Sequence, residues 1–417
     1  HWNKRISRMR SLGGCKVLIS DIEQDPIAAL KYMERVVNDG PPSGLKFTNN
    51  VSLETNPWLC DRVDIDLALC PQDTVKIIGT EQTIISKILG CRGLFIHPDF
   101  KKRFSNNTQI ERILTGYPTS SARTICVSSI GSYIKLHYPG ILGRVDKSLS
   151  EQDIINSVDV TSLLKRAVAR GKVSSLLSFF PEESGRVGIL GNSIFSFTVR
   201  DIQPYGKDNT DISYIIPAFS LYGQDYLAPY DDTLLSQLIE QKKDVGIHYT
   251  EHLLIPIIDC YLSLLFNEGL QHEMHSQNFL LGFNKRWELS AIILRDIESI
   301  QKDMTIRSDQ QIEEPVNSYP NRCLWRGQIN YEEKHSFMFD HKIYDFFISP
   351  LLNKIGKDET EKRKCLSAVS AFVQEKYHDQ IREYFPKNGK WYKFDDVIVS
   401  RAVKRRLFLE CDNPVLR

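Results

Sequence analysis

The segment of residues 271–296 constrains the fold of this chain more than any other. It contains two short apolar runs, residues 279–281 (Phe-Leu-Leu) and 291–294 (Ala-Ile-Ile-Leu), separated by residues 282–285 (Gly-Phe-Asn-Lys), which have the composition of a turn. This pattern predicts a β-hairpin with Asn278 and Asp296 side by side at its open end and Glu273 just before the first strand. Mg²⁺ takes few protein ligands, usually carboxylate or amide oxygens, and keeps water and phosphate oxygens in its other positions. We therefore predict that Glu273, Asn278 and Asp296 hold Mg²⁺ against phosphates; the alternative is a buried polar hairpin whose side chains satisfy one another.

Composition indicates a soluble globular protein. The chain has 417 residues, enough for two or three domains, and its 53 basic residues nearly balance 52 acidic ones, giving a net charge of +1. Such a neutral surface does not attract nucleic acid or membrane, so any anionic ligand must be held locally. For the same reason, the basic run Lys404-Arg405-Arg406 is interpreted as a solvated helix face.

Neither a membrane span nor a disulfide framework is expected. The longest apolar run, residues 253–266, is interrupted by Pro256, Asp259 and Ser263, which predicts a core helix. Nine cysteines are scattered without a Cys-x-x-Cys pair, which favours reduced thiols and a cytoplasmic location.

The character of the chain changes near residue 225. Upstream, short strands dominate, including residues 93–96 and an alternating segment from Tyr133 to Tyr138. Three upstream helical segments are also expected: one opened by Asp25-Pro26, a short one over residues 80–89, and one after Pro139-Gly140 with Ser150 and Thr161 as caps and Gly171 as its stop. Downstream, helical periodicity covers residues 231–241, 249–268, 340–354 and 360–385, interrupted only by the hairpin. We predict an α+β protein with a strand-rich region (residues 1–225) and a mostly helical region that carries the hairpin (residues 226–417).

A second candidate site lies at residues 119–124. Thr119, Ser121, Arg123 and Thr124 place three hydroxyls and a guanidinium directly before a strand. Hydroxyls can donate to phosphate oxygens and an Arg fork can bind two of them at once, so this segment is a candidate anion site. Lys135 alternates with apolar neighbours on the next strand and can therefore present its ammonium to the same anion.

Taken in order, four motifs resemble those of the NRPS-independent siderophore synthetases, the aerobactin-synthetase-like family. That family has a His-Pro segment, a Ser-x-Arg-Thr segment, a Lys-Leu strand and a Glu-x-His-x-Gln-Asn segment followed by Arg-Asp. Here they read His97-Pro98, Ser121-Ala122-Arg123-Thr124, Lys135-Leu136 and Glu273-Met274-His275-Ser276-Gln277-Asn278 with Arg295-Asp296. The resemblance covers about residues 93–300.

The resemblance implies a fingers-like first half and a palm-like second half with ATP in the cleft between them. It also implies an enzyme that uses ATP and Mg²⁺ to adenylate a carboxylate of citrate or a similar acid, and then condenses it with an amine or hydroxyl. The substrates would be small molecules, and the protein could be a homodimer. The implied ATP-binding residues are Thr119, Ser121, Arg123, Thr124, Lys135, His275 and Gln277, of which Arg123, Lys135 and His275 would be catalytic. The implied metal ligands are Glu273, Asn278 and Asp296, and the implied substrate-binding residues are His97, Arg144, Lys147 and Arg295.

The chain departs from the family pattern on the substrate side. Asp99-Phe100 follow His97-Pro98 where the family has Trp-Gln, and an earlier His-Pro-x-His-Pro-x-x-Lys segment has no clear match. The family arginine after the Lys-Leu strand also lacks a clear match, because Arg144 comes early and Lys147 has the right spacing but a different charged group.

Two other interpretations stay open at the level of sequence. A small-molecule kinase of the aminoglycoside or choline kinase type also has an Asn and an Asp on such a hairpin, but it needs a catalytic Asp where this chain has Glu273. A nucleotide-binding pseudo-enzyme would keep the phosphate-side motifs and lose turnover.

Overall fold

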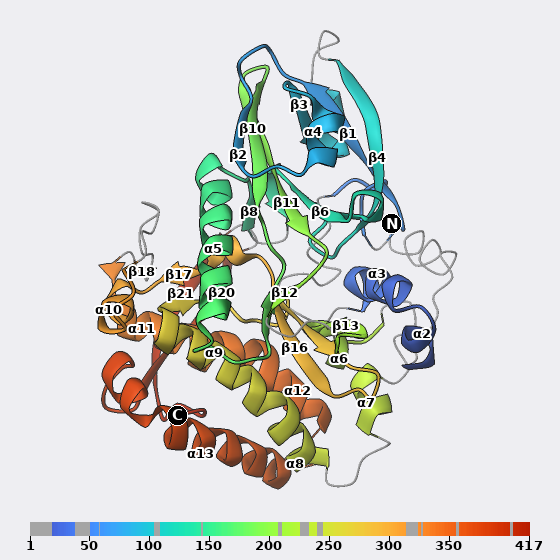
Figure 1. The fold of residues 1–417 in the computed structure, drawn as a ribbon. Helices are drawn as coiled ribbons and strands as arrows, with labels where there is room; N and C mark the ends of the chain where they lie inside the picture. The colour runs from blue at the N-terminus through green and yellow to red at the C-terminus, as the bar shows by residue number, and fades with distance from the viewer. Residues whose placement is uncertain are drawn as a thin grey trace.

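The computed structural model describes residues 19–37, 51–57, 59–103, 109–142, 145–206, 211–225, 233–239, 245–313, 324–326, 328–355, 358–400 and 403–417. It is a mixed α+β protein, with a large antiparallel sheet in its upper part and most of its helices below (Figure 1). The predicted α+β class is therefore confirmed.

The large sheet has eight strands in the order β2-β10-β11-β6-β5-β4-β1-β3. Their bounds are β1 (Val63–Leu69), β2 (Lys76–Gly79), β3 (Gly93–Ile96), β4 (Ile110–Pro118), β5 (Thr124–Val127), β6 (Ser132–Leu136), β10 (Ser184–Leu190) and β11 (Ser193–Asp201). The sheet is curved. Its edge strand β3 is five positions from β11 in the strand order, yet Phe95 of β3 packs on Phe197 of β11 with ring centroids 4.9 Å apart. Its inner face is an apolar core that includes Ile125, Ile134 and Leu136.

The opposite face of the central strands is polar and also buried. In the antiparallel register Lys135 pairs with Thr124 on one side and Thr198 on the other, and Tyr133 pairs with Arg200. Residues directly opposite one another on antiparallel strands share a face. The predicted alternation of this segment is therefore confirmed, and it turns Lys135 away from the apolar core.

A second, five-stranded sheet has the order β12-β9-β16-β15-β13. Its strands are β9 (Leu177–Phe179), β12 (Tyr205–Gly206), β13 (Tyr214–Pro217), β15 (Phe279–Phe283) and β16 (Leu289–Leu294). Strands β15 and β16 are the predicted hairpin, although its turn begins two residues later than expected, at Asn284, whose backbone bonds to Glu288. Because strands from both sides of residue 225 share this sheet, the division at residues 225 and 226 stays a prediction.

Helices surround this second sheet. They are α2 (Ile19–Gln24), α3 (Pro26–Val36), α6 (Ala218–Tyr222), α7 (Leu234–Ile239), α8 (Val245–Tyr249), α9 (Ile255–Glu268), α10 (Met304–Asp309), α11 (Tyr331–Ser336), α12 (Ser349–Ile355) and α13 (Glu359–Tyr384), with π-helical turns at Thr250–Leu254 and Phe337–Ile348. The segment Val245–Glu268 is long and apolar enough to cross a membrane, but 72% of its most apolar window is buried inside the protein. It is therefore a core helix, as predicted.

Helix α5 (Glu151–Arg170) runs beside the junction of the two sheets (Figure 1), while α4 (Thr83–Leu89) covers the upper sheet. Ser150 caps α5 in a reciprocal capping box with Asp153, and Gly171 ends it in the left-handed conformation, as predicted. Thr161, predicted as a cap, lies inside the helix instead. Its hydroxyl donates to the carbonyl of Glu182 (3.1 Å) and accepts from the Glu182 amide (2.9 Å), which fixes the position of Glu182.

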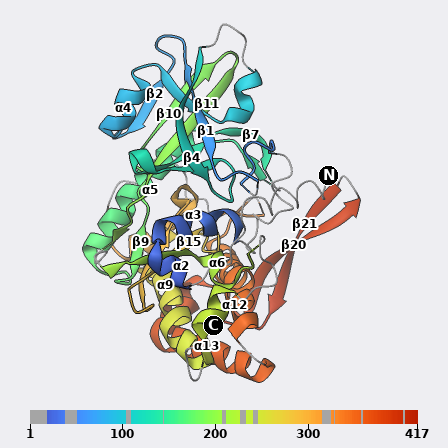
Figure 2. The ribbon, with the colours of Figure 1, turned by 90° about the vertical axis from the view of Figure 1, so that its right-hand side faces the viewer.

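The C-terminal region contains a second hairpin that sequence reasoning missed. Strands β20 (Lys390–Ser400) and β21 (Val403–Asp412) form a two-stranded ribbon that extends from the helical part (Figure 2). The prediction of a helix at Lys404-Arg405-Arg406 was wrong, because these residues are part of β21. The remaining short pairs are β7 (Tyr138–Leu142) with β8 (Val145–Lys147), β14 (Leu270–Gln271) with β17 (Gln301–Lys302), and β18 (Leu324–Trp325) with β19 (Gln328–Ile329).

Candidate active site

The segment of residues 119–124 is a tight turn between β4 and β5. The Thr119 hydroxyl donates to the carbonyl of Thr124 (2.8 Å), and the Ser121 hydroxyl accepts from the Thr124 amide (3.2 Å). Ala122 has a left-handed backbone, with φ of 62°, which is strained for a residue with a Cβ. The hydroxyl-rich motif therefore shapes its own turn.

His97 contacts the backbone of this turn. Its side chain is fully buried, its Nε2 lies 3.2 Å from the Ala122 carbonyl, and its ring packs edge-on against Tyr138. Burial lowers the pKa of His97, so the ring is neutral at pH 7. The predicted contact between His97 and substrate stays a prediction, and this arrangement favours a positioning role.

The open end of the hairpin places Asp296 opposite the turn. The Arg295 amide donates to the Asn278 carbonyl (2.9 Å), so Asn278 faces Arg295 and is diagonal to Asp296. Asp296 then adopts a left-handed backbone (φ 54°, ψ 46°) and leaves the strand direction. Its carboxylate points to the upper sheet, 3.2 Å from the Lys135 ammonium and 2.5 Å from Arg200.

The two predicted segments therefore converge. One cavity, which we call the turn–hairpin cavity, is lined from the upper sheet by the turn and from below by the hairpin end. Its lining residues are Glu34, Thr119, Ser120, Ser121, Thr124, Tyr133, Arg200, Gln277, Arg295 and Asp296. Five of the predicted site residues outside the metal set share this cavity with Asp296: Thr119, Ser121, Thr124, Gln277 and Arg295.

Beside this cavity lies a cluster of three carboxylates, from Glu182, Asp296 and Glu298, with oxygens within 4.8 Å of one another. Lys135 bridges Asp296 and Glu298, and Arg200 bridges Asp296 and Glu182. Burial raises the pKa of Asp296, but Lys135 and Arg200 outweigh it and hold the pKa well below its usual value. Burial dominates for Glu298 and raises its pKa.

This acidic cluster fits a divalent cation. Oε2 of Glu182 and Oε2 of Glu298 are buried without a hydrogen-bond partner among the described residues. A buried carboxylate oxygen without a donor is costly, so an ion or ligand is the expected partner. Carboxylate oxygens are the ligands that Mg²⁺ prefers. Glu182, Asp296 and Glu298 are therefore candidate metal ligands, although Lys135 and Arg200 pair with them in this structure.

The other two predicted metal ligands lie apart from this cluster. Among the described carboxylates, Glu273 is not a member, and it pairs instead with Lys342 at 2.8 Å. Burial raises the pKa of Glu273, but Lys342 outweighs it and lowers the pKa to about 2. The Asn278 amide donates to the Glu273 carbonyl (3.0 Å) and thus shapes the loop before the hairpin. Metal binding by Glu273 and Asn278 stays a prediction.

His275 is a neutral group at the edge of the site. Burial lowers its pKa to about 4, although Glu273 opposes that shift. Its Nδ1 accepts from the Gln277 amide at 3.3 Å, so Nε2 carries the proton in the neutral ring. At pH 7 the ring can therefore donate a hydrogen bond but adds no charge.

Two further cations lie next to the carboxylates. Arg123 is buried and donates to the Lys147 carbonyl (2.7 Å), with Glu298 and Asp296 as its strongest charged neighbours. Burial, reinforced by Arg123, lowers the pKa of Lys147 to about 8. Arg144 lies outside the described residues.

A second cavity, of about 410 Å³, adjoins the cluster and is called the lysine–phenylalanine cavity here. Its lining includes the carboxylates of Glu273 and Glu298 together with Lys334, Phe337, Lys342 and Phe394. The Lys342 ammonium lies 4.8 Å from the ring centroid of Phe394 and 5.4 Å from that of Phe337. The volume suits a small metabolite.

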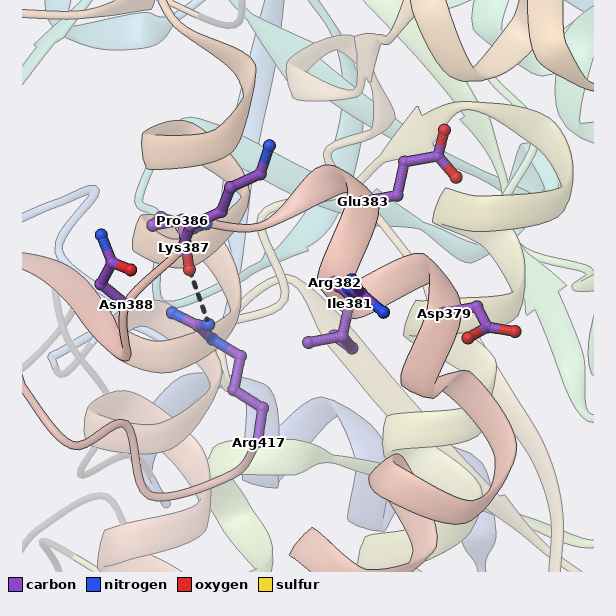
Figure 3. Close-up of a pocket in the computed structure, with 8 residues that line it drawn as sticks. All are labelled: Asp379, Ile381, Arg382, Glu383, Pro386, Lys387, Asn388 and Arg417. Atoms are coloured by element: carbon purple, nitrogen blue, oxygen red, sulfur yellow. Dashed lines mark hydrogen bonds between the residues drawn. The ribbon is translucent and has the colours of Figure 1, made fainter.

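Another cavity, of about 690 Å³, lies elsewhere, around the end of α13 and Arg417 (Figure 3). None of the predicted site residues lines it, and Arg417 is engaged by Asp340 at 2.8 Å. Volume alone therefore does not identify the site.

Sequence reasoning missed Glu34, Glu182, Arg200 and Glu298. A signal existed for Arg200, because the apolar alternation of Phe195, Phe197 and Val199 leaves it on the opposite, buried face of β11. Glu298 lies two residues after Asp296 and could have been considered with it. Glu34 and Glu182 carried no comparable local signal.

No protein-family profile and no curated protein sequence matches this chain. Solved structures do match. The petrobactin biosynthesis protein AsbB from Bacillus anthracis str. Sterne has a TM-score of 0.66 at 13% identity, covering 99% of this chain and 78% of AsbB. The aerobactin synthetase IucA from hypervirulent Klebsiella pneumoniae, also solved with ATP bound, has a TM-score of 0.62 at 13% identity in that form, covering 99% of this chain and 82% of IucA. IucC from the same pathotype has a TM-score of 0.56 at 13% identity, covering 80% of this chain and 67% of IucC. The chain thus has the fold of the NRPS-independent siderophore synthetases, the family that its motifs resemble.

Proposed function

We propose that this protein is an ATP- and Mg²⁺-dependent synthetase that adenylates a carboxylate of a citrate-like polycarboxylic acid and condenses it with an amine or hydroxyl, as in siderophore biosynthesis. The observation that carries this proposal is the shared cavity between the turn and the hairpin, where Thr119, Ser121 and Thr124 face Gln277 and Asp296. The solved structure of IucA with ATP supports the choice of nucleotide.

For adenylation, the protein must position the two reactants and stabilise the negative charge that develops on the phosphate oxygens. A carboxylate oxygen of the acid attacks the α-phosphorus of ATP, pyrophosphate leaves, and negative charge builds up on the phosphate oxygens. Arg123 and Lys135 are buried cations close to Asp296, which lines the shared cavity, so they can stabilise that charge once Lys135 is released from its carboxylate partners. The lowered pKa of His275 keeps its ring neutral, which suits a hydrogen-bond donor to a phosphate oxygen or to the acid.

A magnesium ion, when bound, would neutralise phosphate charge at this site. The candidate ligands are Asp296 with Glu182 and Glu298, or Asp296 with Glu273 and Asn278 as the hairpin motif implies. Either set must first release Asp296 from Lys135 and Arg200, whose cations would then be free for the phosphates.

The lysine–phenylalanine cavity is the candidate site for the acid or for the nucleophile. It reaches Glu298 and is therefore continuous with the carboxylate cluster. Lys334 and Lys342 on its wall can hold carboxylates that do not react. In the second half-reaction, the amine or hydroxyl attacks the carbonyl carbon of the acyl adenylate, loses a proton, and AMP leaves.

The decisive experiment is product analysis with a panel of polycarboxylic acids and amines. We expect AMP and pyrophosphate, together with acid-dependent ATP–pyrophosphate exchange. Formation of ADP would establish the kinase alternative, and nucleotide-dependent thermal stabilisation without pyrophosphate release would establish the pseudo-enzyme. The cytoplasmic location and a homodimer stay predictions.

A further inference from the structure

The C-terminal ribbon of β20 and β21 contributes a side chain to the lysine–phenylalanine cavity. Phe394 of β20 lies directly opposite Phe408 of β21 in the antiparallel register, so the two rings share one face of the ribbon. That face packs on the helical part of the protein. The Phe408 ring lies against Trp325, with centroids 4.8 Å apart, and the Phe394 ring lies against Phe337, with centroids 5.5 Å apart. The ribbon thereby places Phe394 in the lining of the cavity.

Phe394 is held in place by neighbours other than the ribbon. Its ring centroid lies 5.1 Å from that of His341, and the Lys342 ammonium lies 4.8 Å from it. Both neighbours belong to the π-helical segment Phe337–Ile348, and π-helical turns are frequent at functional sites. The side chain itself is half-buried. Phe394 is therefore a fixed, apolar part of the cavity lining.

The charges of this cavity favour the nucleophile over the polycarboxylic acid. Its described lining holds three carboxyl groups and three lysines, namely Asp153, Glu273, Glu298, Lys302, Lys334 and Lys342. There is thus no excess of positive charge for an acid with several negative charges. Two of the lysines are engaged within the protein, because Lys302 donates to Asp159 at 2.6 Å and Lys342 pairs with Glu273 at 2.8 Å. The described lining also contains no arginine, the side chain that clamps a carboxylate through two hydrogen bonds.

The apolar part of the lining indicates what kind of nucleophile fits. It is formed by Ile300, Phe337, Met338 and Phe394. Such a surface suits methylene groups better than a compact acid that is polar all round. The volume of about 410 Å³ is sufficient for a small metabolite. The cavity also reaches Glu298 of the carboxylate cluster, so a nucleophile bound here would lie next to the proposed site of adenylation.

We infer that the lysine–phenylalanine cavity receives the nucleophile, an amine or hydroxyl on a partly apolar body, and that Phe394 is a specificity-determining residue that limits the size of this body. The inference rests on the proposed function, because the nucleophile needs an acyl adenylate to attack. In that step the nitrogen or oxygen of the nucleophile forms a bond to the carbonyl carbon, the bond from that carbon to AMP breaks, and the proton of the nucleophile passes to water. Phe394 takes no part in these bond changes.

The test compares hydroxylamine with O-benzylhydroxylamine as nucleophiles, using the full chain with ATP, Mg²⁺ and the acid that gives the fastest exchange. Both compounds attack through the same amino group and differ in the size of the rest. In Phe394→Ala the benzyl ring can occupy the space of the deleted phenyl ring, so kcat/KM for the benzyl compound relative to hydroxylamine should rise about tenfold. Phe394→Leu should raise this ratio less, and Phe394→Trp should lower it.

A second readout separates the two half-reactions. ATP–pyrophosphate exchange depends on the acid and needs no nucleophile. If the acid binds outside the lysine–phenylalanine cavity, its KM in exchange should change by less than about threefold in the Phe394 variants, well below the change in the nucleophile ratio.

Phe372→Ala is the matched control. Phe372 of α13 is also half-buried and has a lysine ammonium, that of Lys376, 5.7 Å from its ring centroid, but it lies outside the cavity lining. This variant should therefore keep the natural ratio. Thermal denaturation monitors the folding of every variant, and a ratio of two rates is insensitive to the fraction of protein that is folded.

Each outcome decides the inference. Opposite changes of the ratio in Phe394→Ala and Phe394→Trp, with the natural ratio in the control, support it. An unchanged ratio in all Phe394 variants overturns it and leaves Phe394 as a residue that only docks the ribbon. A change in the KM for the acid that exceeds the change in the ratio also overturns it, because the cavity would then hold the acid. These results leave the proposed function standing, whereas a natural protein without any acid-dependent exchange would overturn both.

Discussion

Two arginines on adjacent strands, Arg186 on β10 and Arg200 on β11, show how a structural ion pair differs from a candidate site. Both are almost fully buried. Arg186 donates through Nε and Nη2 to the two oxygens of Glu81, each at 2.6 Å, and through Nη1 to the carbonyls of Gly90 and Gly93. No side-chain atom of this pair lacks a partner among the described residues.

Arg200 is bound differently. It is shared between Glu182 and Asp296, in a cluster where Glu182 and Glu298 each keep a buried oxygen without a described partner. The cluster also adjoins two cavities, whereas Glu81 and Arg186 line neither. Burial of charge therefore does not mark a candidate site by itself, and we base the candidate on buried oxygens without a described partner, two adjoining cavities and the predicted motifs taken together.

The largest effect is expected from Asp296→Ala. This change removes the carboxylate that both Lys135 and Arg200 contact and that every candidate metal set includes. We expect acid-dependent ATP–pyrophosphate exchange to fall by about 10³-fold or below detection, since a single preorganised group is worth about 10²- to 10³-fold. Hydroxylamine trapping of the acyl adenylate is the independent readout, and exchange that survives the substitution would falsify the assignment of Asp296.

Arg186→Met tests the structural side of the comparison. It leaves the Glu81 carboxylate buried without its partner, so the free energy of unfolding should fall by about 3–5 kcal/mol, measured by urea denaturation. The folded fraction should exchange pyrophosphate within about twofold of the natural rate. The double variant Glu81→Leu/Arg186→Met should recover most of the stability, because it removes both charges. A large loss of exchange per folded molecule would erase the distinction between the two arginines.

Features of the fold that depend on neighbouring residues could be predicted from the sequence, whereas features that depend on contacts between distant segments could not. Local rules of periodicity and capping predicted the hairpin and α5 with its Ser150 cap. They also predicted that Lys135 lies on the face of its strand opposite the apolar core. The convergence of Thr119 and Asp296 on one cavity followed from the family resemblance alone, since no local rule joins residues so far apart. Glu182 and Glu34 were missed because their roles depend on where Thr161 and α3 place them in space.

A smaller effect should separate the two candidate metal sets. Glu298→Gln weakens a member of the carboxylate cluster, while Glu273→Gln weakens a carboxylate already neutralised by Lys342. If Glu182, Asp296 and Glu298 hold the metal, the Mg²⁺ concentration for half-maximal exchange should rise about 10- to 100-fold in Glu298→Gln, the range for groups that support a metal site, and by less than about threefold in Glu273→Gln. The reverse order would favour the set of Glu273, Asn278 and Asp296.

The smallest effect concerns Lys147, whose pKa is lowered to about 8 by burial and by Arg123. Between pH 8 and its ordinary pKa of 10.5, the unfolded chain binds a proton that the folded protein does not, so this residue's contribution to stability rises with pH. Ligand binding should change in the opposite direction, because the charge that attracts phosphate or carboxylate is lost above pH 8. We expect the KM for ATP or for the acid to rise up to about tenfold from pH 7 to pH 9, following the loss of the protonated fraction of Lys147. Lys147→Arg keeps its charge throughout this range and should flatten the profile, although its fork contacts oxygens differently from an ammonium. An identical pH profile in both proteins would place Lys147 with Arg186, as a buried cation that serves the fold and not the ligand.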